Sequence, residues 1–299
     1  MISRSTLVHF RLPFFFFLSP VFLFSLVVSP HPDLFRTLLA FFILHFLVYP
    51  ASNAFNSWFD RDTTAIGGVE CPPVVTPDLP VVVNVMDLLA IGLGLFAGWP
   101  FAAGCAAYVV CSRLYSWDRT RLKRRPVISW LMVGLGQGTA VFLMSYYAIN
   151  HPAWKELFSS RVLLAGLLPG LFLLAAYPLT QVYQHEADRD RGDASMSMLL
   201  GVEGTFRFAL VFFSIVTAGY CVYLYCWFGV LQASGFVLFL APLIINFLLW
   251  YGRVRKDLAA ADFRSLMRQN LLSALCLNSY FILLFVYETW ARGKAGLPG

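Results

Sequence analysis

Long apolar runs recur along the whole chain and are interrupted only by short polar segments. Nine of them are long enough to cross a bilayer as helices, since about 20 predominantly apolar residues span its hydrocarbon core. They cover approximately residues 11–29, 34–53, 81–98, 100–116, 126–148, 161–182, 205–228, 233–252 and 269–291. The pattern predicts an all-α, polytopic membrane protein that forms a single domain over residues 1–299.

The composition indicates that lipid, rather than water, is the main solvent of this chain. Hydrophobic residues make up 59% and charged residues only 13%, whereas soluble domains are about 45–50% apolar and about 25% charged. A net charge of +6 could indicate a nucleic-acid partner, but the cations lie in short loops beside apolar runs. Such loops are typical of membrane topology and of contact with anionic lipid. We therefore expect a bilayer as partner and no nucleic acid.

The distribution of Lys and Arg predicts the orientation of the helices. With a cytoplasmic N-terminus and nine spans, the cytoplasmic segments hold all of the 22 cations except Arg36, Lys155, Arg161, Arg292 and Lys294. This asymmetry follows the positive-inside rule. The N-terminal run lacks a small-residue cleavage site, so we interpret it as the first span rather than as a signal peptide. The expected location is the inner or plasma membrane of the cell.

Acidic residues gather in two segments on the predicted cytoplasmic side. Carboxylates within or beside membrane spans are costly and often mark function. Of the sixteen, nine lie after the second and sixth spans, namely Asp60, Asp62, Glu70 and Asp78 in the first segment and Glu186, Asp188, Asp190, Asp193 and Glu203 in the second. Between them, on the same predicted face, lies a basic segment over residues 119–125. The shared plan hints at an internal duplication, although no residue-level repeat is visible.

The spacing within these segments predicts a metal site. Asn56 and Asp60 are four residues apart, as are Gln184 and Asp188, so each pair shares one face of a helix. Carboxylate and amide oxygens are ligands that Mg²⁺ accepts, and Mg²⁺ typically bridges carboxylates to substrate phosphates. Cations beside such a site would stabilise the charge on a departing diphosphate.

Three ordered motifs resemble those of the UbiA superfamily of intramembrane aromatic prenyltransferases. The segment Asn56-Ser57-Trp58-Phe59-Asp60-Arg61 is similar to the first motif, and Tyr115-Ser116 followed by Lys123-Arg124 is similar to the second. Glu186-x-Asp188-Arg189-x-x-Gly192 is similar to the third. The resemblance implies a bundle of about nine helices and Mg²⁺-dependent transfer of a prenyl group from its diphosphate. The acceptor would be an aromatic or other lipophilic molecule within the membrane.

The same resemblance implies roles for individual residues. Catalytic roles would fall to Asp60, Asp188 and Lys123. The metal ligands would be Asn56, Asp60, Asp62, Glu186 and Asp188, and the substrate would be bound by Asn56, Arg61, Tyr115, Arg124, Gln184 and Arg189.

The sequence also departs from the family pattern and leaves other functions open. Thr64 and Gln184 stand where many relatives carry acids, and the stretch 66–73 lacks the usual cation. A non-catalytic member that binds lipid or prenyl diphosphate is therefore one alternative. A cation transporter is another, for which Asp87 and Glu288 are the conspicuous acids within predicted spans.

Overall fold

A computed structural model describes residues 2–294, so residue 1 and residues 295–299 of the expected single domain lie outside the described part. Within this range the chain is helical, with one isolated bridge between Ile66 and Val69 and no strand. Two helices contain π-helical turns, over Ile43–Val48 and Gly134–Ala140, and 3₁₀ turns cover Leu122–Arg124, Tyr177–Gln184 and Leu258–Ala260. The helices are α1 (Arg4–His9), α2 (Pro13–Val28), α3 (Leu34–Phe42), α4 (Tyr49–Asp60), α5 (Leu79–Ala97), α6 (Trp99–Ser116), α7 (Pro126–Val133), α8 (Val141–Asn150), α9 (Trp154–Leu157), α10 (Ser160–Ala176), α11 (His185–Asp190), α12 (Met196–Trp227), α13 (Val230–Val254) and α14 (Phe263–Lys294).

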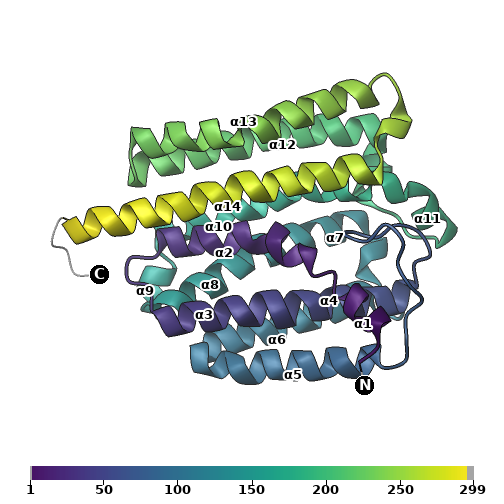
Figure 1. Ribbon diagram of the computed structural model, residues 1–299, viewed down its shortest axis with the longest axis horizontal. Helices are drawn as coiled ribbons and strands as arrows, with labels where there is room; N and C mark the ends of the chain where they lie inside the picture. Colours follow the sequence, from purple (N-terminus) through teal and green to yellow (C-terminus); the bar gives the residue numbers. More distant parts are fainter. Residues whose placement is uncertain (1, 295–299) are drawn as a thin grey trace.

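The long helices lie side by side with roughly parallel axes (Figure 1). Helix α11, the end of α4 and the start of α7 lie at one end of this bundle, and α9 lies at the other. We call the first end the polar mouth, defined by residues 60–62, 117–125 and 185–195. Both predicted acidic segments and the basic segment are therefore found at the same end of the bundle.

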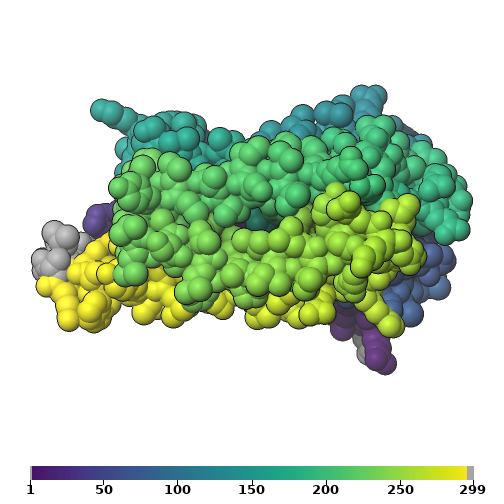
Figure 2. Space-filling view, turned by 90° about the horizontal axis from the view of Figure 1, so that it is seen from above, coloured from purple at the N-terminus to yellow at the C-terminus, as the bar shows by residue number. Residues whose placement is uncertain are grey.

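Eight helical segments within the described residues are long and apolar enough to cross a membrane. The prediction of about nine spans is close to this number. The predicted span 100–116 corresponds to α6, which is helical and packs against α5 after a tight turn at Gly98, but is not among the eight. Figure 2 shows a face covered by α12 and α13, which pack against each other and expose large apolar side chains such as Ile215, Leu238 and Leu249. The chain is an integral membrane protein, because such a surface requires lipid.

Local backbone features fix where the polar mouth begins. Helix α4 ends at Asp60 because Arg61 takes the left-handed conformation with φ 47°, which turns the chain so that Asp62 follows on a new segment. Helix α10 gives way to a 3₁₀ turn at Tyr177–Gln184, whose second residue, Pro178, has no backbone N–H to continue the α-helical ladder. Pro178 therefore ends the α-helical hydrogen bonding just before the second acidic segment.

The opposite half of the bundle is filled by aromatic side chains. The ring of Phe24 packs against those of Phe142, Tyr220 and Phe281, with centroid distances of 5.5, 5.1 and 5.0 Å. All four side chains are buried. Aromatic pairs at this separation add specific edge and face contacts to the burial of apolar area. The packed half gives the polar mouth a rigid support.

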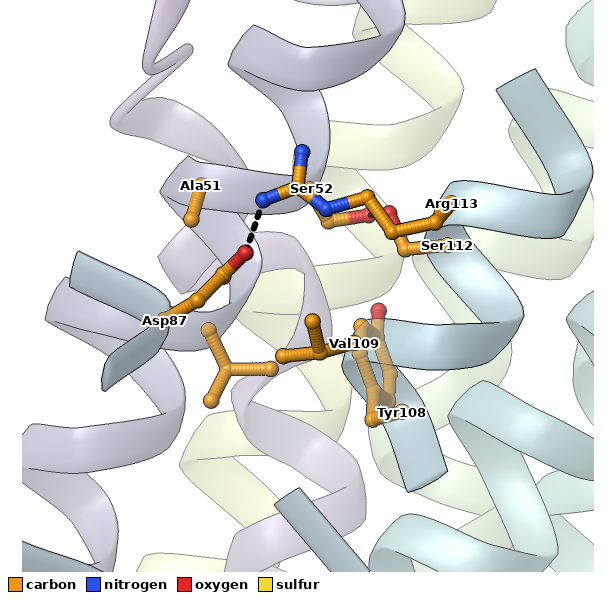
Figure 3. A pocket seen from close by; sticks show the side chains of 8 residues that line it. Ala51, Ser52, Asp87, Tyr108, Val109, Ser112 and Arg113 are labelled. Atoms are coloured by element: carbon orange, nitrogen blue, oxygen red, sulfur yellow. Dashed lines mark hydrogen bonds and ion pairs between the residues drawn. The ribbon is translucent and has the colours of Figure 1, made fainter. Parts of the chain in front are cut away.

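A further ion pair joins α5 and α6 about one helical turn from residue 117 of the polar mouth. Asp87 on α5 and Arg113 on α6 point toward one another across a narrow pocket that α4 also lines (Figure 3). Arg113 further donates to Asn84 Oδ1 at 3.1 Å and lies over the ring of Phe55 at 3.7 Å. Asp87, one of the two acids that a cation transporter could use, is therefore paired with Arg113. Glu288 likewise accepts a hydrogen bond, from Gln232 at 3.4 Å.

Loss of this pair should destabilise the protein without affecting its chemistry. Removing one partner of a buried pair leaves an uncompensated charge and costs about 3 kcal/mol, so we expect Asp87→Ala to lower the midpoint of thermal unfolding in detergent. The matched control is Glu203→Ala, which removes the exposed pair with Arg207 and should shift the midpoint far less, because exposed ion pairs contribute little to stability. Equal shifts in the two variants would show that the Asp87–Arg113 pair contributes no more than a surface pair.

Candidate active site

Asp60 lies in the last turn of α4 and is linked to the basic segment. Its side chain is only 6% exposed and pairs with Lys123 and with Arg121, whose Nη2 lies 3.4 Å from Asp60 Oδ1. Lys123 Nζ also lies 3.1 Å from Oδ2 of Asp193, which follows α11. One ammonium group thus joins the first acidic segment to the second.

Asp193 pairs with three cations, more than any other carboxylate described at the polar mouth. Arg121 donates to both of its oxygens, from Nε at 3.0 Å and from Nη2 at 3.1 Å, and Arg124 Nε donates at 2.9 Å. Burial opposes ionisation of Asp193, but the hydrogen bonds from Arg121 and the charge of Lys123 outweigh it and hold the pKa of this carboxyl well below its usual range. The side chain is therefore ionised at neutral pH.

Arg191 joins the two acidic segments a second time. Its guanidinium pairs with Asp62 through Nη1 and with Asp188 Oδ1 through Nη2 at 3.2 Å. The carboxylates of Asp62 and Asp188 are 7% and 13% exposed. Because one planar guanidinium touches both, these two carboxylates are separated by little more than its width.

The polar mouth therefore contains two neighbouring ion-pair clusters in which charges of the two signs alternate, one around Asp60 and Asp193 and one around Arg191. They are joined through the backbone, by bonds from Arg124 Nη2 to Arg191 O at 3.4 Å and from Asp193 N to Asp188 O at 2.9 Å, and we call them together the network. Within residues 2–294, no group of three or more His, Cys, Asp or Glu side chains is arranged to hold a metal ion directly, because cations lie between the acids. The network consists of the carboxylates of Asp60, Asp62, Asp188 and Asp193 and the cations Arg121, Lys123, Arg124 and Arg191.

Two predicted substrate-binding residues lie beside this network. Asn56 donates from Nδ2 to Ser116 Oγ at 3.3 Å and accepts at Oδ1 from Arg11 Nη2 at 3.5 Å. The hydroxyl groups of Tyr115 and Tyr177 are hydrogen-bonded at 2.6 Å. Asn56 on α4 thus contacts Ser116 on α6, and Tyr115 is the residue before Ser116. Both predicted residues therefore lie where the ends of α4 and α6 meet.

The comparison with known proteins starts from a protein-family model. The model described as the UbiA prenyltransferase family matches residues 17–272, which is most of the chain. The chain belongs to this family.

Solved UbiA homologues share the architecture. A UbiA homolog from Aeropyrum pernix K1 in its apo form has a TM-score of 0.69 and 16% identity, covering 91% of this chain and 98% of that one. A UbiA homolog from Archaeoglobus fulgidus bound to GPP and Mg²⁺ has a TM-score of 0.64 and 16% identity, covering 94% and 99%. A digeranylgeranylglyceryl phosphate synthase has a TM-score of 0.60 and 18% identity, covering 95% and 97%. At these identities the likeness establishes the fold, and a comparison with curated protein sequences gives no match.

Other residues of the predicted UbiA site lie apart from the network. Gln184 is half-buried and has no side-chain hydrogen bond among the described residues. Three other predicted site residues are exposed to solvent, namely Arg61, Glu186 and Arg189. The Arg61 guanidinium lies 5.7 Å from the centroid of the Trp58 ring. The structure thus brings together Asp60, Asp62, Asp188, Lys123 and Arg124, with Asn56 and Tyr115 close by.

Three members of the network and one neighbour were absent from the predicted UbiA site. The motif segments contain these three charges, Arg121, Arg191 and Asp193. Their spacing along the chain does not indicate that Arg121 pairs with Asp193 or that Arg191 pairs with Asp62. Arg11 was interpreted only as a topology-setting cation. Arg11 is a buried residue, and its Nη2 donates to Ser57 Oγ at 2.8 Å. A long-range contact between residues 11 and 57 leaves no signal in a single sequence.

Proposed function

We propose that the chain catalyses Mg²⁺-dependent transfer of a prenyl group from a prenyl diphosphate to an aromatic or other lipophilic acceptor in the membrane. The observation that carries this proposal is that Lys123 contacts both Asp60 and Asp193, so that all three charged motifs meet in one buried network. Membership of the UbiA family supports prenyl transfer in general. The positive-inside distribution supports a polar mouth that faces the cytoplasm, and we place the protein in the inner or plasma membrane.

The network supplies carboxylate oxygens, the donor type that Mg²⁺ prefers, but the cations that lie between the acids must be displaced before one ion can contact several of them. We assign Asp60, Asp62 and Asp188 as the carboxylates that would hold it, because they are buried oxygen donors from both segments and Arg191 already places a positive charge between two of them. When bound, Mg²⁺ would neutralise the diphosphate and stabilise the negative charge that develops on it during bond cleavage. Glu186 is exposed and Asn56 is bonded to Ser116, so their proposed roles as ligands need a side-chain rearrangement.

Charge balance explains why binding should require the metal. The network holds four buried carboxylates and four cations, and the exposed Asp118 adds a fifth carboxylate on Arg121, so the network has no net positive charge. A diphosphate entering it alone would add uncompensated negative charge in a buried environment, which is strongly unfavourable. Divalent cations entering with the diphosphate remove this cost.

The two parts of the substrate would meet different side chains. The phosphate oxygens would be bound by Lys123, Arg121 and Arg124, and the Tyr115–Tyr177 pair offers aromatic faces to an allylic cation.

The proposal is tested by incubating membranes that contain the protein with labelled prenyl diphosphates of several lengths and Mg²⁺, followed by lipid extraction. We expect a prenylated lipid and an equal amount of released diphosphate, both abolished by EDTA and restored by excess Mg²⁺. The mass of the product identifies donor and acceptor together. Membranes containing Asp188→Asn protein are the control, and an equal yield from them would contradict the proposal.

The closed ion-pair network also favours one alternative, a family member that binds prenyl diphosphate without transferring it. Every buried carboxylate of the network is paired to a cation, and Gln184 and Thr64 supply no charge. Saturable binding of a labelled prenyl diphosphate without product on any extracted lipid acceptor would support this alternative.

A further inference from the structure

Asp193 occupies the position at which the basic segment would meet an external anion. Its two oxygens accept hydrogen bonds from Arg121, and its carboxylate also contacts Arg124 and Lys123 at 2.9 and 3.1 Å. Bidentate recognition by arginine combined with a lysine charge is the usual arrangement for binding phosphate. At 4% exposure, the Asp193 side chain is also the most buried carboxylate of the network.

We propose that Asp193 is a built-in competitor of the diphosphate, which holds the three phosphate-binding cations in the free protein and must be displaced when the substrate binds. This inference rests on the proposed function, because it concerns the same cations. Asp193 would thereby set the affinity for the prenyl diphosphate. None of the residues that the sequence predicted for the site acts as a competing anion.

The local structure allows such a displacement. Asp193 lies on the five-residue connection 191–195 between α11 and α12, outside both helices. The connection is held by backbone hydrogen bonds from Gly192 N to Arg189 O at 3.0 Å and from Asp193 N to Asp188 O at 2.9 Å. Residue 192 is glycine with φ 66°, a left-handed conformation that glycine adopts without strain. Movement of this connection does not require either helix to unfold.

The test compares the binding of inorganic pyrophosphate with Mg²⁺ to the full-length protein and to Asp193→Asn in detergent, by isothermal titration calorimetry. Asparagine keeps the shape of the side chain but removes the competing charge. We expect the dissociation constant for pyrophosphate to fall by about tenfold, within the range of typical coupling between two ligands at linked sites. The matched control is Asp118→Asn, which removes another partner of Arg121 at 2.7 Å whose side chain is 66% exposed. It should change the dissociation constant less than twofold.

Hydrogen exchange of the wild-type protein tests the same inference if Asp193→Asn does not fold. Binding of pyrophosphate with Mg²⁺ should accelerate exchange of the amides of residues 191–195, because the released connection loses its anchor, whereas an ordinary ligand slows exchange at its site. Unchanged or slower exchange there would overturn the inference, and so would unchanged or weaker binding by Asp193→Asn. If the wild-type protein itself fails to bind pyrophosphate, the proposed function fails together with the inference. If it binds and the variant binds no more tightly, only the inference fails.

Discussion

Asp188→Asn should lower the rate of Mg²⁺-dependent diphosphate release by on the order of 10³-fold, and Asp60→Asn should have a similar effect. Loss of one preorganised group that stabilises transition-state charge commonly costs 10²–10³ in kcat, and loss of a metal-binding charge adds to this. The two residues lie on separate acidic segments and contact different cations, Arg191 and Lys123. The measurement is the initial rate of diphosphate release from purified protein in lipid nanodiscs across a range of Mg²⁺ concentrations.

An exposed acid on the same helix provides the control for this prediction. Asp190 lies two residues after Asp188 on α11 and is exposed to solvent, so Asp190→Asn removes the same formal charge at the edge of the polar mouth. We expect a rate within twofold of wild type. Full activity of Asp188→Asn would remove its assigned role. A large loss in Asp190→Asn would show that net charge, rather than ligation at Asp188, controls the rate.

The sequence predicted the fold well because burial in lipid imposes a strong and simple pattern. Long apolar runs correspond to helices throughout the described chain, although some helices begin well before the predicted span, as α12 does at Met196 against a predicted start at 205. The span at 100–116 is helical as predicted, but Arg113 and several small residues reduce its apolar character. Its arginine is accommodated by pairing with Asp87 on the neighbouring helix, and such pairing cannot be read from either segment alone.

The prediction of the acidic faces was less successful because the local helix type changes. Four-residue spacing predicts one shared face only for an α-helix with 3.6 residues per turn. Residues 177–184 form a 3₁₀ turn with about three residues per turn, and α11 begins only at His185. Gln184 is the last residue of the 3₁₀ turn and Asp188 lies on α11, so this pair does not sit on one continuous α-helix.

The positions of the cations could not be predicted from spacing at all. Arg191 and Asp193 reach back to residues 62 and 121–124, more than 65 residues away along the chain. These pairings depend on how the α11–α12 connection lies over the end of α4. The predicted topology placed these segments on one side of the membrane, and the family motifs, which record the acids and the Lys-Arg pair, added the indication that they form one site.

Lys123→Gln should have the second largest effect, with a fall of about 10²-fold in kcat/KM for the prenyl diphosphate. Lys123 contacts both Asp60 and Asp193, as Arg121 also does, and its side chain is nine-tenths buried, with an exposure of 10%. A charge in such a site interacts with phosphate far more strongly than a charge in water does. The reduction should combine a higher KM with a lower kcat, because the ammonium group would contact the diphosphate both before and during bond cleavage. Steady-state kinetics at saturating Mg²⁺ separates the two contributions.

Burial, rather than membership of the basic segment, should determine how large each loss is. Arg124 contacts the same Asp193, but its side chain is 50% exposed, so Arg124→Gln should lower kcat/KM by only about tenfold because solvent and salt screen it. Arg125 is exposed and forms no ion pair within the described residues, and Arg125→Gln serves as the neutral control. Lys123→Arg keeps the charge and should recover part of the activity, which a purely structural role at a tightly packed position would not permit. Equal losses from Lys123→Gln and Arg125→Gln would mean that the segment acts through its overall charge, and the assignment of Lys123 as a contact to the diphosphate would then be wrong.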